Sequence, residues 1–180
     1  MSVRERWLEK GLDVLAREGH RAVTIDRLCN ELSLTKGSFY HHFSGVADFE
    51  AAMLEHFSYR ETQRYVELAE AGAGDAPQQR IKRLQAAVVR GGAGSASLEV
   101  AVRGWATQDA VARTALEEID RRRLDYLESV LQDMTSSKSE ARAVARMIYL
   151  VLIGGYHHLP PMPMREISRL WDRILATLES

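Results

Sequence analysis

Apolar residues recur at intervals of three and four along almost the whole chain, and alternation with a period of two is nowhere sustained. This spacing is typical of amphipathic α-helices, which bury one face. Only four prolines occur, and three of them lie together at Pro160, Pro161 and Pro163, so that long stretches are free to be helical. The pattern therefore predicts an all-α protein of about nine helices.

The first 45 residues predict three short helices that form a small head. The first helix ends near Gly19, and its apolar positions are Trp7, Leu8, Leu12 and Leu15. Thr24 and Thr35 then offer N-caps to two further helices only eleven residues apart, and Phe39 and Phe43 share one face of the last helix. Two short helices joined by a brief turn predict a helix-turn-helix from Thr24 to Phe43.

Residues 46–180 predict a larger helical body. The periodic pattern is interrupted twice. Residues 71–77 have the composition of a loop, and we expect the glycine-rich stretch at 91–95 to close a helix. The predicted helices of the body begin near Phe49, Ile81, Leu98, Val111, Ala141 and Ile167. The sequence thus divides into a head, residues 1–45, and a body, residues 46–180.

The helix that begins near Ala141 is apolar on every side, because Met147, Leu150 and Val151 fill the faces that its main stripe leaves. A helix that is apolar all round must be buried all round. We therefore expect a second copy of the chain to cover one side, in a four-helix interface built from the last two helices of each protomer. The residues expected at this interface are Ile148, Leu152, Leu170, Trp171 and Ile174.

The charge balance carries no general signature of nucleic-acid binding. The net charge is −1, and the first 50 residues hold seven Lys/Arg (4, 6, 10, 17, 21, 27, 36) against eight Asp/Glu (5, 9, 13, 18, 26, 31, 48, 50). A small head can still present cations on one face and acids on another, which a sum does not detect. The hydrophobic content of 46% and the charged content of 27% are those of an ordinary folded protein.

No set of residues predicts an enzyme, a metal site or a cofactor. The chain has no nucleophile–base–acid arrangement, and no Gly-Lys-Ser/Thr follows the glycines at 91–94, which excludes a P-loop there. The adjacent His41 and His42 point about 100° apart on a helix and cannot readily chelate one ion. A helical enzyme is therefore the weakest hypothesis for this chain.

Several features favour a cytoplasmic protein. The single cysteine, Cys29, excludes an intramolecular disulfide and suits a reducing compartment, and a small packing residue explains it better than a redox sensor. The N-terminus is too charged for a secretory signal. The longest apolar run, residues 147–156, is too short to span a bilayer.

The stretch Lys36-Gly37-Ser38-Phe39-Tyr40-His41-His42-Phe43, preceded by Gly19 and Ala22-Val23-Thr24-Ile25, resembles the N-terminal domain of the TetR/AcrR family of regulators. The resemblance covers about the first 55 residues. In the body it is limited to a short segment, Val102-Arg103-Gly104-Trp105-Ala106. It implies a homodimer that binds operator DNA and is released by a small-molecule effector. The residues that it implies at DNA are Thr24, Thr35, Lys36, Ser38, Tyr40 and His41.

Three positions depart from that family's pattern. Cys29 replaces a small residue, usually alanine, and Ser33 replaces a turn residue that is often glycine, which leaves its backbone less free to adopt a positive φ. Val46 stands where the family often has a lysine on phosphate. We expect weaker affinity for the DNA backbone, or a compensating contact.

The resemblance also implies an effector pocket in the body. Aromatic and long apolar residues are candidates for its lining, although ordinary core packing is the better explanation for any single one of them: Phe57, Leu84, Trp105, Tyr126, Met147 and Tyr149. A mostly apolar effector would suit them. The alternative hypothesis is a ligand-binding or interaction module whose head no longer binds DNA, and steep salt dependence of DNA affinity would separate the two.

Overall fold

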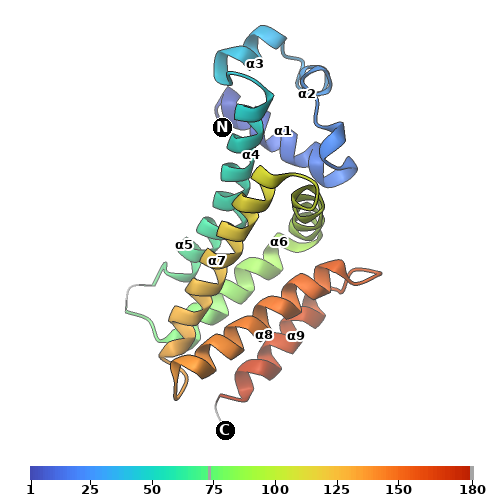
Figure 1. The fold of residues 1–180 in the computed structure, drawn as a ribbon. Helices are drawn as coiled ribbons and strands as arrows, with labels where there is room; N and C mark the ends of the chain where they lie inside the picture. Colours follow the sequence, from blue (N-terminus) through green and yellow to red (C-terminus); the bar gives the residue numbers. More distant parts are fainter. Residues whose placement is uncertain (73, 179–180) are drawn as a thin grey trace. The chain divides into compact units, whose positions relative to one another are not determined.

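The computed structural model describes residues 1–72 and 74–178, in which all regular elements are helices (Figure 1). The first half of the chain contains α1 (Val3–Glu18), the 3-10 turn η1 (His20–Ala22), α2 (Ile25–Leu32), α3 (Lys36–His42), α4 (Val46–Ser58), the π-helix η2 (Tyr59–Gln63) and α5 (Arg64–Ala69). The second half contains α6 (Pro77–Ala106), α7 (Ala110–Gln132), α8 (Lys138–His157) and α9 (Met164–Ala176). The predicted all-α fold is confirmed.

The glycine-rich stretch at 91–95 interrupts the helix as predicted: two helical segments, labelled together as α6, meet at a kink at Gly92, whose φ of 60° and ψ of −149° are non-helical. The helix expected near Phe49 begins at Val46 and changes to π-helical hydrogen bonding at Tyr59. Such π-segments are rare and often mark functional positions in helices.

Contacts between α-carbons divide the chain into two compact units. Unit 1 comprises Met1–Glu61 and Ser97–Glu118, and unit 2 comprises Thr62–Ala96 and Ile119–Ser180. The chain therefore passes between the units three times, within η2, α6 and α7. The functional division after residue 45 stays a prediction.

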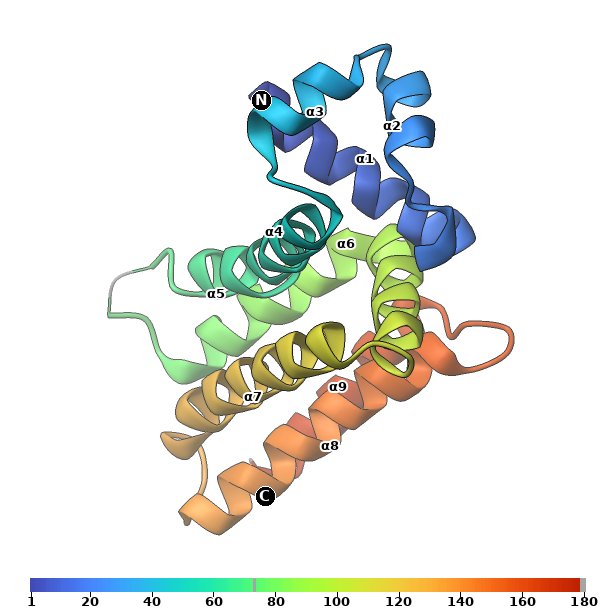
Figure 2. The ribbon, with the colours of Figure 1, turned by 45° about the horizontal axis from the view of Figure 1, so that its top comes forward.

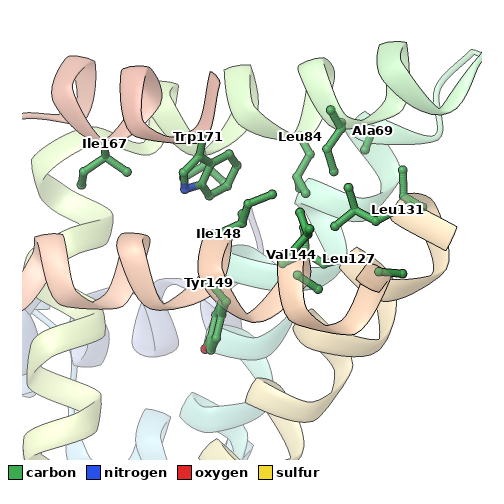
Figure 3. Packing of buried hydrophobic residues seen from close by; sticks show 14 of the residues in the cluster. Ala69, Leu84, Leu127, Leu131, Val144, Ile148, Tyr149, Ile167 and Trp171 are labelled. Carbon is green, nitrogen blue, oxygen red and sulfur yellow. The ribbon is translucent and has the colours of Figure 1, made fainter. Parts of the chain in front are cut away.

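Unit 2 is built around a core to which α8 and α9 contribute facing residues (Figure 3). Ile148 and Trp171 point toward one another there and are 0% and 2% exposed, so they lie in the core of their own chain and not at the surface where a partner would meet them. The exposed apolar residues of α8 are instead Met147 and Leu150, at 46% and 66%. Helix α8 has two apolar stripes, and the sequence pattern does not say which one faces its own core.

Unit 1 is held together by α1, which packs against α2 and α4. Gly11 of α1 lies against two side chains of α4: a Cβ there would lie 2.5 Å from Met53 Sδ and 2.8 Å from Phe49 Cζ. No side chain fits between the two helices at this point. The contact fixes α4, which follows the helix-turn-helix directly in the chain.

Within the described residues, no helix is long and apolar enough to cross a membrane, and no group of three or more His, Cys, Asp or Glu side chains could hold a metal ion.

The substitution Gly11→Val should lower the free energy of unfolding by about 1–3 kcal/mol, because the added methyl groups overpack the junction of α1 and α4. Urea unfolding followed by circular dichroism measures this. Gly104→Val is the matched control, since Gly104 is exposed in α6 with open space around its Cβ position, and its effect should stay within about 0.5 kcal/mol. Equal midpoints for the two variants would contradict the assigned contact.

Candidate nucleic-acid interface

Helix α2 begins and ends at residues that satisfy its free backbone groups. Thr24 is the N-cap, and its hydroxyl accepts a hydrogen bond from the backbone N–H of Arg27 at 3.4 Å. Ser33 follows the helix in the left-handed conformation, with φ 54° and ψ 43°, and Leu34 N–H donates to Cys29 O at 3.0 Å. Serine thus adopts the positive φ that glycine would adopt with less strain, and the turn keeps its shape.

Helix α3 follows after a turn of three residues. Thr35 caps it, because its hydroxyl accepts from the Ser38 N–H at 3.2 Å, and the helix ends at Phe43, whose backbone is extended. Figure 2 shows α2 and α3 joined by this short turn, with α1 alongside. The two predicted N-caps, and with them the predicted helix-turn-helix, are confirmed in the structure.

One face of α3 is anchored by aromatic contacts. Phe39 is fully buried, and its ring centroid lies 5.4 Å from those of Trp7 and Phe49 and 5.2 Å from that of Phe43. The contacts with Trp7 and Phe49 are edge-to-face, the favourable arrangement for aromatic quadrupoles. Phe39 therefore fixes α3 against both α1 and α4.

The opposite face of α3 presents polar groups to solvent. Lys36, Tyr40 and His41 are exposed, Tyr40 at 57%, while Ser38 is half-buried. Thr24 and Thr35 are exposed as well, at the N-terminal ends of the two helices. All six residues predicted at DNA thus belong to the helix-turn-helix, and five of them are exposed.

Most cations of the head are paired with its acids. Arg27 donates to Glu18 and Glu31, and these hydrogen bonds hold the pKa values of both carboxyls below their usual range. Arg17 and Lys10 also pair with Glu31, which ties α1 to α2. Several cations of the head therefore form ion pairs that join α1 to α2.

A further ion pair lies at the start of α3. Lys36 Nζ is 2.6 Å from Asp26 Oδ1, and the hydrogen bond to this carboxylate raises the pKa of Lys36. Asp26 stands in the first turn of α2. No sequence pattern marks Asp26, because only the folded turn brings residues ten positions apart into contact.

Trp105, one of the candidates for an effector pocket, contacts the head within unit 1. Its ring stacks on that of His20 at 4.2 Å between centroids and 9° between planes. His20 Nε2 lies 2.6 Å from Glu50 Oε1 on α4. The end of α6 is therefore linked through His20 to η1 and α4.

The other pocket candidates are divided between the units. Phe57 is buried in unit 1, while Leu84 and Tyr149 are buried in unit 2, where Tyr149 donates to Asp120 Oδ1 at 2.5 Å. Tyr126 donates to Glu70 Oε1 at 2.7 Å, and partial burial raises its pKa. Met147 lies on the exposed side of α8. The lining of a pocket stays a prediction.

The helix-turn-helix matches a known family model, "Bacterial regulatory proteins, tetR family", over residues 8–49. The chain carries the TetR-family N-terminal domain. The resemblance inferred from the sequence is thereby confirmed.

Individual relatives agree with this assignment. The transcriptional regulator AcuR of Cereibacter sphaeroides is 38% identical over 48 residues, which are 27% of this chain and 22% of AcuR. The HTH-type transcriptional repressor NemR of Escherichia coli is 33% identical over 72 residues, 40% of this chain and 36% of NemR. The matched segments thus span little more than a third of these relatives at most.

The fold of the whole chain is also that of TetR-family proteins. The crystal structure of reduced Escherichia coli NemR superposes with a TM-score of 0.75 at 23% identity, covering 98% of this chain and 96% of that one. A TetR-family transcriptional regulator from Streptomyces coelicolor gives a TM-score of 0.78 at 19% identity, covering 98% and 96%. At this identity the likeness concerns the fold alone.

Proposed function

We propose that this protein is a homodimeric, sequence-specific DNA-binding transcriptional regulator, a repressor that a small-molecule effector releases from its operator in the cytoplasm. The observation that carries the proposal is helix α3: Phe39 anchors it on α1 and α4, and its polar face is open to solvent. A recognition helix needs both properties, since it must enter the major groove without bending away from its support.

The caps of the two helices suit phosphate binding. Helix N-termini present free backbone N–H groups and a partial positive charge to anions. Thr24 and Thr35 add exposed hydroxyls at these ends, and Tyr40 offers a phenol on the same face as Lys36. In this proposal the threonines and Tyr40 bind phosphate, while Lys36, Ser38 and His41 face base edges.

A second copy of the chain supplies the second recognition helix, which binds the other half-site of the operator. The exposed apolar residues Met147 and Leu150 on α8 support pairing through this helix, with Leu152, Leu170 and Ile174 half-buried around it. Dimers of helix-turn-helix proteins place their recognition helices about one DNA turn apart, in successive major grooves. The operator is then a palindrome.

The contact of His20 with Trp105 supports a route from effector to DNA. An effector bound by the body shifts α6 and with it Trp105, and the ring stacked on Trp105 belongs to the segment that leads into α2. The effector then favours a head spacing that no longer matches the operator.

Selection of bound duplexes from random DNA by the purified protein, at two salt concentrations, tests the proposal. If the head is functional, the selected duplexes share a palindrome, and the affinity of the protein for DNA falls steeply as the salt concentration rises. The reason is that protein cations that neutralise phosphates release the counterions condensed on the DNA. The second candidate function, a ligand-binding module with an inactive head, is favoured by Val46 and by the lack of excess cations in the first 50 residues, seven Lys/Arg against eight Asp/Glu. It predicts no enrichment, with and without candidate effectors.

Val46→Lys should strengthen binding to every duplex and steepen the slope of log K against log salt by about one, because it adds one phosphate contact. Val46 is 48% exposed at the first position of α4, directly after the helix-turn-helix. Val111→Lys, at a 66% exposed position, adds the same charge elsewhere in unit 1 and should leave the slope unchanged. Equal slopes for the two variants would remove residue 46 from the DNA face.

Leu150→Glu should weaken the dimer at least tenfold, since a carboxylate in an apolar interface loses its hydration without gaining a partner. Sedimentation velocity at several protein concentrations measures the shift toward monomer. Val111→Glu is the matched control, because Val111 is exposed to the same extent, 66%. If Leu150→Glu sediments as the wild-type chain does, α8 is not the dimer helix.

A further inference from the structure

We infer that Asp26 and Lys36 together form the determinant that reads one G·C base pair in each half of the operator. This inference rests on the proposed function, since it concerns what the helix-turn-helix recognises once it lies in the groove. It assigns base specificity to a residue of α2, Asp26, that the sequence pattern does not mark.

The placement of the pair is suited to base contact. Lys36 is the first residue of α3, and the N-terminal residues of a recognition helix are those that meet base edges. Asp26 Oδ1 lies 2.6 Å from Lys36 Nζ, so the carboxylate is held at the same end of α3. The two side chains are 73% and 60% exposed, which leaves their remaining hydrogen-bonding capacity open to a ligand.

The phosphates of a bound DNA do not stabilise the Asp26 carboxylate. Phosphates repel it, and it neutralises the lysine that would otherwise attract them. The donors that DNA offers in the major groove are the amino groups of cytosine and adenine. Asp26 therefore gains nothing from the DNA backbone and can gain a hydrogen bond from a base edge.

The chemistry of the pair favours G·C over A·T. Guanine presents two neighbouring acceptors, O6 and N7, which lysine binds well, and cytosine N4 beside them donates to a carboxylate. Within the base pair, N4 and O6 are joined by a hydrogen bond of about 2.9 Å, close to the separation of Asp26 Oδ1 and Lys36 Nζ. Each protein atom can thus face one base atom, and the four form a closed ring of hydrogen bonds.

An A·T pair fits this pair of side chains less well. It also offers a donor next to an acceptor, but thymine O4 is a single acceptor with the C5-methyl group beside it. Lysine then loses one acceptor and meets an apolar group. The geometry points to G·C, with cytosine facing Asp26 and guanine facing Lys36.

The test compares the sequences that full-length wild type and Asp26→Ala select from random duplexes. The wild type should select a palindrome with G·C at one position of each half-site, and replacing that pair by A·T should weaken binding about 5- to 150-fold. Asp26→Ala should lose the preference at this position alone. Asp13→Ala removes the same charge from α1, where Asp13 pairs with Lys10 and Arg17, and should keep the wild-type preference.

Two results would overturn the inference, and they differ. If Asp26→Ala selects the same bases as wild type at every position and binds all duplexes more tightly, the carboxylate only neutralises Lys36. If the wild-type chain recovers no palindrome, the proposed function itself fails and this inference with it. Unchanged circular dichroism spectra and melting curves show that each variant is folded, which is expected for an exposed side chain.

Discussion

The burial of Phe39 is the contact on which the candidate DNA-binding surface depends. Helix α3 has only seven residues, too few to be stable in isolation, and its position is set by what its buried face touches. Trp7 of α1 and Phe49 of α4 hold the Phe39 ring from two directions. Without this anchor, neither the caps nor the exposed polar residues would have a fixed orientation toward a groove.

Ion pairs add to the aromatic contacts that hold the helices of the head together. Ion pairs between α1 and α2 engage Lys10, Arg17 and Arg27, and at least one acid, Asp26, engages the lysine that opens α3. Surface ion pairs contribute little stability each, about 0–1 kcal/mol. In the proposed DNA complex these pairs compete with phosphate for the four cations, so that the proposed recognition rests more on base edges and on backbone N–H groups than on general attraction to DNA.

The head could be predicted from sequence because its determinants are local. Thr24 and Thr35 cap their helices through hydrogen bonds three residues away, and Phe39 and Phe43 share a face by helical spacing. The glycines at 91–95 predict the interruption that the structure has at Gly92, where α6 is kinked. Other features depend on tertiary packing. The π-helix η2 has no recognisable sequence signal.

The body shows a different limit of sequence reasoning. Helix α8 carries apolar residues all round, and only the structure shows that Ile148 faces its own core while Leu150 faces outward. The contact of Asp26 with Lys36 likewise requires the folded turn. Sequence periodicity finds the helices and their apolar positions, whereas the buried face of a helix that is apolar all round, and the contacts between residues of different helices, are set by the folded structure.

In the proposed complex, two copies of this chain bind successive major grooves of one duplex. Hydroxyl-radical footprinting of the full chain on its selected DNA measures this directly. Two protected patches are expected on one face of the duplex, with centres one helical turn, roughly 10 base pairs, apart. A single patch, or uniform protection without a preferred site, would contradict it.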